Sequence, residues 1–121
     1  MSKSLIQDKS LFFAVRCVNL YKHLSEQKHE FVLSKQMLRS GTSIGANITE
    51  SRNAQSDADF ISKLSIALKE ADETQYWLEL LKLTNYITIE EHESINNDLS
   101  ELIAMLTATI KKKKYNQNGE G

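Results

Sequence analysis

The side chains that could carry chemistry are few in this sequence and poorly spaced for catalysis. A thiol nucleophile needs a positioned base, but Cys17 is the only cysteine and His23, six residues away, is not at helical contact spacing. The sequence contains no glycine-rich phosphate loop, and one cysteine cannot form the common thiolate zinc sites. We therefore expect no enzymatic activity and no cofactor.

Metal chemistry has one candidate motif. Glu26 and His29 have the Glu-x-x-His spacing of di-iron helical bundles, which need two such motifs and two further glutamates. These two residues fall at a predicted helix break, and His92 is far away in the sequence. We therefore expect no metal site.

The elements that position these residues must be helices. The 121 residues include no proline and four glycines, two of them among the last three residues, so little interrupts a helix. Hydrophobic residues make up 40% and charged residues 26%, which is typical of one globular domain. We predict an all-α fold, an antiparallel up-down-up-down four-helix bundle over residues 1–114, with a disordered polar C-terminal tail over residues 115–121.

The first predicted helix runs from about Asp8 to Glu26 and carries two neighbouring apolar stripes. One stripe contains Phe13, Cys17, Leu20 and Leu24, and the other contains Leu11, Ala14, Val18 and Tyr21. Together they predict a wide buried face. The second predicted helix runs from about Glu30 to Glu50. Its predicted core residues are Leu33, Met37, Ile44 and Ile48.

Capping boxes predict where the last two helices begin. Ser56 with Asp59 precedes the third helix, and Thr88 with Glu91 precedes the fourth. The third helix has a seam in steps of three and four: Phe60, Leu64, Ala67, Ala71, Thr74, Leu78 and Leu81. The fourth is marked by Ile95, Leu99, Leu102 and Leu106 and is expected to end among the lysines.

A polar stripe lies beside the apolar one on the second predicted helix. Its members are Gln36, Ser40, Ser43, Asn47 and Glu50. Gly41 and Gly45 lie in the same helix, where each costs up to about 1 kcal/mol relative to alanine, so we expect a partner helix to approach closely there. Ala67, Ala71 and Thr74 offer a matching small surface on the third helix. We predict an inter-helix polar network that joins the stripe to Glu73 and Thr74; the alternative is that the stripe faces solvent.

These same segments resemble a known family. The stretch SGTSIGANITES, followed by DFISKLSIALKEADETQYWLELL, resembles the bacterial four-helix bundles named 23S ribosomal RNA intervening-sequence proteins. Ser43, Ile44, Asn47 and Glu50 match an SI-x-x-N-I-x-E core. Phe60, Ala67, Glu73, Thr74 and Leu78 match a second motif, and the similarity covers about residues 11–87.

The resemblance implies a self-associating bundle, a ring-like homopentamer, with no established enzymatic activity. It also implies a fold similar to the accessory proteins of diversity-generating retroelements, which are basic and associated with nucleic acid. This chain has a formal net charge of -1, so their RNA-binding role transfers less well than their fold. Many family members have proline at the position of Gly45 and glycine at the position of Ser51. These two differences imply a less sharp end to the second helix in this chain.

One basic cluster is present, formed by Lys111, Lys112, Lys113 and Lys114. Lysines at a helix C-terminus complement the helix dipole and keep a tail solvated, which is the simpler interpretation. The alternative is salt-sensitive contact with nucleic acid, strengthened if several copies of the tail act together.

Three further residues predict a contact surface on the third helix. Tyr76, Trp77 and Leu80 extend its apolar perimeter beyond the Leu64–Leu81 seam, where they belong either to the core or to a subunit interface.

The sequence thus predicts a cytoplasmic scaffold or adaptor that assembles with itself and binds an unidentified protein or RNA. The single cysteine indicates a reducing compartment, and no segment approaches the roughly 20 apolar residues of a membrane span. The second hypothesis is an RNA-binding accessory protein that uses the lysine tail or an oligomeric basic rim.

Overall fold

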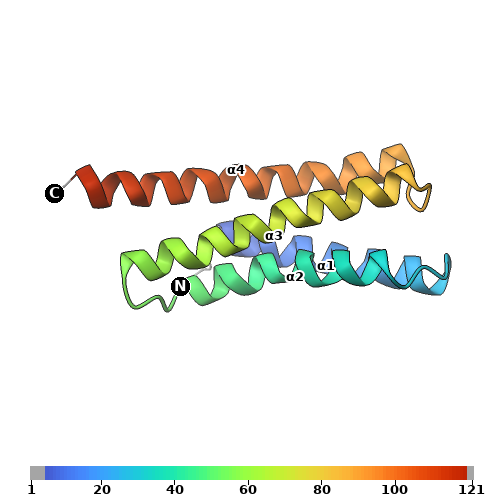
Figure 1. Cartoon of the computed structure of the whole chain (residues 1–121), viewed down its shortest axis with the longest axis horizontal. Helices are drawn as coiled ribbons and strands as arrows, with labels where there is room; N and C mark the ends of the chain where they lie inside the picture. Colours follow the sequence, from blue (N-terminus) through green and yellow to red (C-terminus); the bar gives the residue numbers. More distant parts are fainter. Residues whose placement is uncertain (1–4, 120–121) are drawn as a thin grey trace.

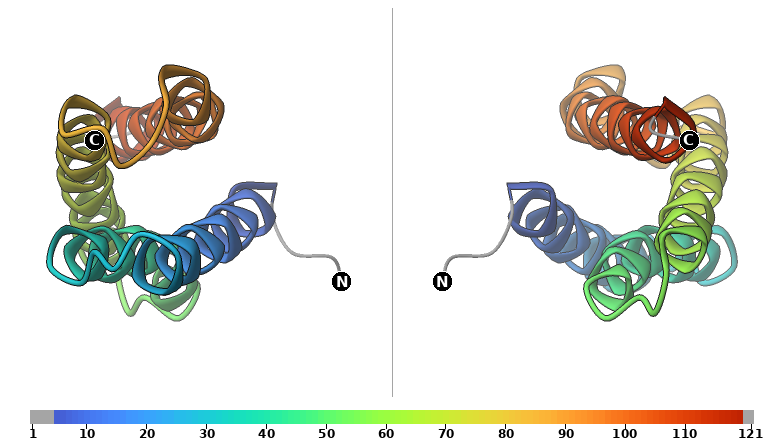
Figure 2. Two further views of the ribbon diagram at one scale, coloured as in Figure 1. Left: turned by 90° about the vertical axis from the view of Figure 1, so that its right-hand side faces the viewer. Right: turned by 90° about the vertical axis from the view of Figure 1, so that its left-hand side faces the viewer.

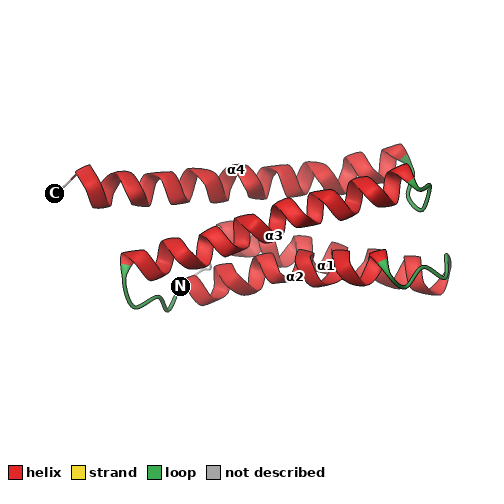
Figure 3. Cartoon of the chain, in the orientation of Figure 1, coloured by secondary structure: helices red, strands yellow, loops and turns green. Residues whose placement is uncertain are grey.

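All four predicted helices are present in the computed structural model, which describes residues 5–119. They are α1 (Leu5–Glu26), α2 (Leu33–Ser51), α3 (Asp57–Leu83) and α4 (Ile89–Gly119). Successive helices run in opposite directions (Figure 1), and the described residues form only helices and the loops that join them (Figure 3). The predicted antiparallel up-down-up-down bundle is confirmed.

The helices follow one another around an arc. Each packs extensively on the next in sequence, whereas α1 and α4 make the least extensive contact, and the open side of the arc lies between them (Figure 2). Two ion pairs span that side: Lys9 Nζ to Glu101 Oε1 and Arg16 Nη1 to Asp98 Oδ2, each at 2.6 Å. Helix packing therefore closes three seams of the bundle, and these charged side chains bridge the fourth.

The core runs along the inside of the arc. Its fully buried large side chains come from every helix: Phe13, Leu24, Met37, Ile44, Ile48, Leu64, Leu78, Leu81, Leu99, Leu102 and Leu106. The predicted inward residues of α2, α3 and α4 lie in this core or, for Leu33 and Phe60, partly buried against it. No helix in residues 5–119 is long and apolar enough to cross a membrane.

The prediction of a wide buried face on the first helix is wrong for two members of its second stripe, Leu11 and Val18, whereas Ala14 and Tyr21 of that stripe are partly buried. Phe13 and Cys17 are fully buried, but Leu11 is 54% exposed and Val18 is 36% exposed. The physical reason is that α1 packs on α2 and only weakly on α4, so the bundle covers one face of α1. The apolar residues beyond that face point outward.

The predicted capping boxes start α3 and α4. The Asp59 backbone N–H donates to Ser56 Oγ (3.0 Å), and the Glu91 N–H donates to Thr88 Oγ1 (3.0 Å). In return Thr88 N–H donates to the Glu91 carboxylate (2.8 Å), whereas Asp59 accepts from Gln55 N–H (3.2 Å) instead of from Ser56. These bonds satisfy amides that would otherwise lack partners at the helix starts.

The start of α2 depends on a buried carboxylate. The second helix begins at Leu33, later than predicted, because Glu30 accepts hydrogen bonds from the backbone N–H groups of Val32 (3.1 Å), Leu33 (2.9 Å) and Ser34 (2.7 Å). His29 precedes it with a φ of 54°, which turns the chain from α1 into this cap. Glu30 therefore replaces the usual side-chain cap of the helix.

The far end of α4 also departs from the prediction. The helix does not end among the lysines but continues to Gly119, so the first part of the expected tail is helical and residues 120–121 lie outside the described residues. Lys113 Nζ lies 3.1 Å from Asp57 Oδ1 and 5.2 Å from the centre of the Phe60 ring. These contacts hold this part of α4 against the start of α3.

The glycines of α2 face α1, not α3 as predicted. A Cβ on Gly41 would lie 2.4 Å from Cys17 Sγ, and a Cβ on Gly45 would lie 3.2 Å from Ser10 Oγ. Both distances are shorter than an ordinary van der Waals contact. The missing side chains therefore allow α1 to approach α2 closely.

Gly41→Ala should lower the free energy of unfolding by about 1–3 kcal/mol, because the new methyl group overpacks the buried Cys17 thiol. Urea unfolding followed by circular dichroism measures this. The double variant with Cys17→Ala should lose less stability than the sum of the two single variants. Additive losses would show that Gly41 and Cys17 do not constrain each other.

Glu30 should make the stability of the bundle depend on pH. Burial raises the pKa of Glu30, but hydrogen bonds from the Leu33, Ser34 and Val32 amides and from the Ser34 side chain lower it more, so the folded pKa lies below the usual 4.5. The stabilisation is therefore complete above pH 4.5 and is lost as the pH falls through the lowered pKa.

Glu30→Gln should lower the free energy of unfolding by about 1 kcal/mol at pH 7, which is the usual loss when a helix cap is removed. The loss should be smaller below pH 4, where the natural Glu30 begins to lose its charge. Urea unfolding at both pH values tests this, with the exposed Glu26→Gln as the control. An equal loss at both values would contradict the role of the Glu30 charge.

Candidate functional site

The predicted polar stripe contains one buried hydrogen bond between α2 and α3. Thr74 Oγ1 donates to Ser40 Oγ at 2.8 Å, and both side chains are completely buried. Thr74 Oγ1 also lies 2.7 Å from the Glu70 carbonyl oxygen, and Ser40 Oγ lies 3.3 Å from that of Met37. Because buried hydroxyls without partners destabilise a fold, this pair fixes how α2 and α3 align.

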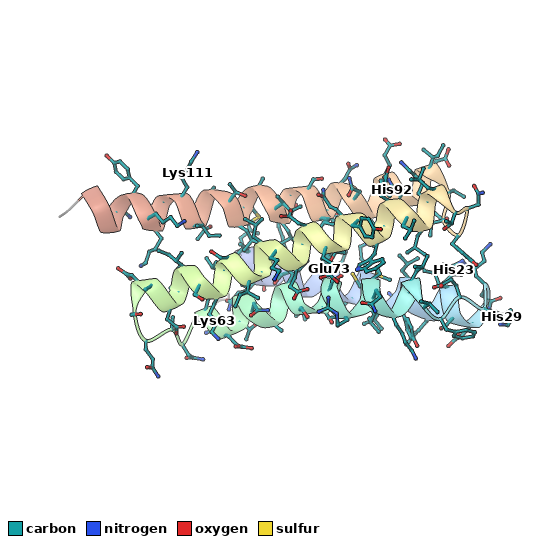
Figure 4. The ribbon with its side chains drawn as sticks, viewed as in Figure 1. His23, His29, Lys63, Glu73, His92 and Lys111 are labelled. Carbon is teal, nitrogen blue, oxygen red and sulfur yellow. The ribbon has the colours of Figure 1, made fainter. Side chains whose placement is uncertain are left out.

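Next to that pair, an ionic cluster closes the outer side of the α2–α3 seam. Arg39 donates to the Glu73 carboxylate, which also accepts from Trp77 Nε1 at 3.0 Å. Glu70 Oε1 lies 3.3 Å from Arg39 Nη1, close enough for an ion pair although it makes no hydrogen bond. The Trp77 N–H, followed by the Arg39 guanidinium, holds the pKa of the Glu73 carboxyl below its usual value. The Glu73 side chain is visible between α3 and α2 (Figure 4).

The other members of the predicted network make different contacts. Ser43 Oγ donates to the Arg39 carbonyl (2.7 Å) and Asn47 Nδ2 to the Ser43 carbonyl (2.9 Å), both within α2. Glu50 is exposed and forms an ion pair with Lys63 at 3.3 Å, and Gln36 is exposed. Three of the predicted residues therefore join α2 to α3 near the core: Ser40 and Thr74 by their hydrogen bond, and Glu73 by its bond to Arg39. Glu50 joins the two helices at the surface, through its ion pair with Lys63.

The four lysines do not act as one cluster. Lys113 is occupied by Asp57 and Phe60, whereas Lys111, Lys112 and Lys114 are exposed. Lys111 points away from the bundle (Figure 4). A regular helix thus presents three ammonium groups to solvent near its end.

Tyr76, Trp77 and Leu80 were predicted to lie either in the core or at a subunit interface, and none of them is fully buried. Trp77 and Leu80 are both partly buried, and the Trp77 side chain donates a hydrogen bond to Glu73. Tyr76 is 61% exposed and packs edge-to-face on Trp77 with ring centroids 5.0 Å apart. Their role in a subunit contact stays a prediction.

A larger apolar surface lies on α1, and two of its members, Leu11 and Val18, were predicted to be buried. We call it the α1 outer face and define it as Leu11, Phe12, Val15 and Val18. Their side chains are 54%, 63%, 49% and 36% exposed. The step of four and then three from Leu11 through Val15 to Val18 was the available signal, because it marks a second apolar stripe on a helix that already had one.

Among the side chains that the structure describes, the polar groups gather at no site with evident catalytic geometry. A groove of about 510 Å³ between α1 and the start of α4 is lined in part by Arg16, His23 and Glu91, but Arg16 already bonds Asp98 and Glu91 already caps α4. Within the described residues, no three His, Cys, Asp or Glu side chains are grouped to hold a metal ion. Burial raises the pKa of the Cys17 thiol to about 12, despite the opposing effect of Arg16, so it is not an activated nucleophile.

Comparison with known proteins agrees with this description. The family model described as "23S rRNA-intervening sequence protein" matches residues 2–108. A crystal structure of a Bacteroides thetaiotaomicron protein from the S23 ribosomal protein family, described as having unknown function, is 65% identical, with a TM-score of 0.88. The similarity covers 88% of this chain and 96% of that one. The search of curated proteins gave no match.

The buried hydroxyl pair should be energetically coupled. Thr74→Val keeps the side-chain shape but leaves Ser40 without its partner, so it should cost about 1–3 kcal/mol of unfolding free energy. Ser40→Ala should cost a similar amount, and the double variant should cost less than the sum. Denaturant unfolding of the four proteins measures the coupling; additive losses would show that the hydrogen bond does not contribute.

Proposed function

The chain belongs to the 23S rRNA-intervening sequence protein family, and on that premise we propose that it is a non-catalytic helical scaffold that assembles with itself. The observation that carries the proposal is the α1 outer face. Four large apolar side chains lie side by side on one helix, each at least 36% exposed, although the bundle has a complete core without them. Contiguous exposed apolar patches are typical of protein interaction sites.

The assembly that we propose is the ring-like homopentamer implied by the family resemblance, formed in the cytoplasm. A ring needs two different contact surfaces on each copy, one for each neighbour. The rigid pairing of α2 with α3 through Ser40, Thr74 and Glu73 supports this role, because it holds the surfaces of one copy in a fixed relation.

A second candidate is RNA binding, favoured by the exposed Lys111, Lys112 and Lys114 on the helical end of α4. Phosphate contact by a few lysines weakens steeply as salt increases. The chain has a net charge of -1, and the exposed apolar residues of α1 contribute nothing to such contact, so we place this candidate second.

Light scattering on a size-exclusion column tests the proposal. We expect one closed species with a mass near five times the 13.8 kDa of the chain. The same species should show no salt-sensitive affinity for a single-stranded RNA titrated at 50 mM and 200 mM salt.

A monomer at micromolar concentration would contradict self-assembly. RNA affinity that falls at the higher salt, and that falls again in a Lys111→Glu, Lys112→Glu variant, would move the RNA-binding function to first place. A Lys35→Glu, Lys69→Glu variant would serve as the charge control, because both lysines are exposed on other helices and the two substitutions change the net charge by the same amount.

A further inference from the structure

The open side of the arc holds a groove between α1 and the start of α4, the two adjoining helices with the least extensive contact. Its volume of about 510 Å³ falls within the roughly 300–1,000 Å³ that is usual for small-molecule sites. We propose that this groove, which we call the α1–α4 groove, binds a small organic cation with an apolar body, such as an arylalkylamine. The site is complete in one copy of the chain, so it does not depend on the proposed self-assembly.

The α1 side of the groove is short. Its lining residues share one side of the helix because they lie in steps of three, one and three: Arg16, Asn19, Leu20 and His23. At a rise of 1.5 Å per residue, this side spans about 10 Å. A peptide helix lying along the seam would need a longer groove, and the Arg16–Asp98 ion pair blocks its extension toward the middle of the bundle. The length therefore fits a small molecule.

Hydrogen bonds within the bundle already fix the walls of the groove. Arg16 Nη1 donates to the Ser94 carbonyl at 3.1 Å and to Asp98 Oδ2 at 2.6 Å, and Arg16 Nη2 donates to Ser94 Oγ at 2.9 Å. These bonds tie α1 to α4 at one end of the groove. At the other end, the capping box of Thr88 and Glu91 holds the first turn of α4. A ligand thus meets a shape that exists before it binds, which lowers the entropy cost of binding.

The floor of the groove is apolar. Ile87 and Ile95 are each 4% exposed and Leu20 is partly buried, so these core side chains present only a small surface to the groove. A hydrocarbon body packed on them removes apolar surface from water, which drives binding. The floor therefore favours a ligand with an apolar body over a fully polar one such as a sugar.

The charges around the groove are complementary to a cation. The positive charge of Arg16 is matched by Asp98, and no lysine in residues 5–119 lines the groove. The carboxylates of Glu90 and Glu91 do line it, and neither forms an ion pair within those residues. Glu91 Oε1 accepts from the Thr88 N–H, which leaves the other Glu91 oxygen available. Two carboxylates can therefore face an ammonium group.

The α1 wall adds hydrogen-bond acceptors opposite these carboxylates. Asn19 and His23 are exposed and make no hydrogen bond within the part of the chain that the structure describes. His23 lies near the end of the bundle that carries the α1–α2 and α3–α4 loops (Figure 4). An amide oxygen and a neutral imidazole nitrogen both accept from an ammonium group. An anion is disfavoured, because the carboxylates oppose the helix dipole that would attract it to the start of α4.

Three probes that share a phenyl ring test the charge preference: phenethylamine, phenethyl alcohol and phenylacetate. Saturation-transfer NMR measures the affinity of each for the natural chain, whatever its assembly state. We expect the amine to bind best, the alcohol less well and the carboxylate least. Equal affinity for the amine and the carboxylate, or no transfer to the amine at millimolar concentration, would overturn the proposal.

Glu90 is the position at which to change the charge, because it is exposed and forms no ion pair within the described bundle. Glu90→Gln should weaken amine binding about two- to fivefold, as for an exposed ion pair, and leave alcohol binding unchanged. Glu90→Lys should reverse the order of the amine and the carboxylate. The same substitutions at Glu93 are the matched controls, because Glu93 is exposed on α4 but does not line the groove. Amine binding that both Glu90 variants leave unchanged would contradict the assigned site.

A variant of the floor tests where the ring binds. Leu20→Ala should weaken all three probes by a similar factor, because each places its ring on this side chain. Leu68→Ala is the control, since Leu68 is also partly buried against the core but lies on α3 outside the groove. Circular dichroism should show folded helices in both variants. If the two substitutions changed binding equally, the ring would not lie in the α1–α4 groove and the proposal would be wrong.

Discussion

Two adjacent residues of α2 determine how the rest of the bundle is arranged. Gly41 lets α1 approach so closely that an added Cβ would lie 2.4 Å from Cys17 Sγ, and its neighbour Ser40 accepts the buried hydrogen bond from Thr74 of α3. One turn of α2 therefore sets the position of the helices on both of its sides. The position of α4 follows from α3, and α1 and α4 are left at the open side of the arc (Figure 2).

Much of this fold could be predicted from local rules. The seam of α3 and the core positions of α4 follow from apolar spacing, and the starts of both helices follow from short-range hydrogen bonds at Ser56 and Thr88. These signals are contained within a few consecutive residues. The cap formed by Glu30 was missed because a buried glutamate at that place also fits the first turn of a helix.

The candidate site was harder to predict because it depends on which helix lies beside which. The sequence indicated that small residues of α2 meet a close partner, but it could not show that the glycines face α1 while Ser40 faces α3. In the same way, Leu11 and Val18 are as apolar as core residues, and periodicity cannot tell a core face from an interface. In the structure, α1 packs on α2 and only weakly on α4, and this is why Leu11 and Val18 are exposed instead of lying in the core.

The central claim is that the α1 outer face is covered in solution by another copy of the chain, and the reactivity of a thiol at Val15 tests it most directly. The one native cysteine is buried, with a pKa of about 12, so a Val15→Cys variant carries one reactive probe. We predict slow modification by a thiol reagent at high protein concentration and faster modification on dilution. Fast modification that does not change with protein concentration would show that the face is open to solvent and would contradict the account.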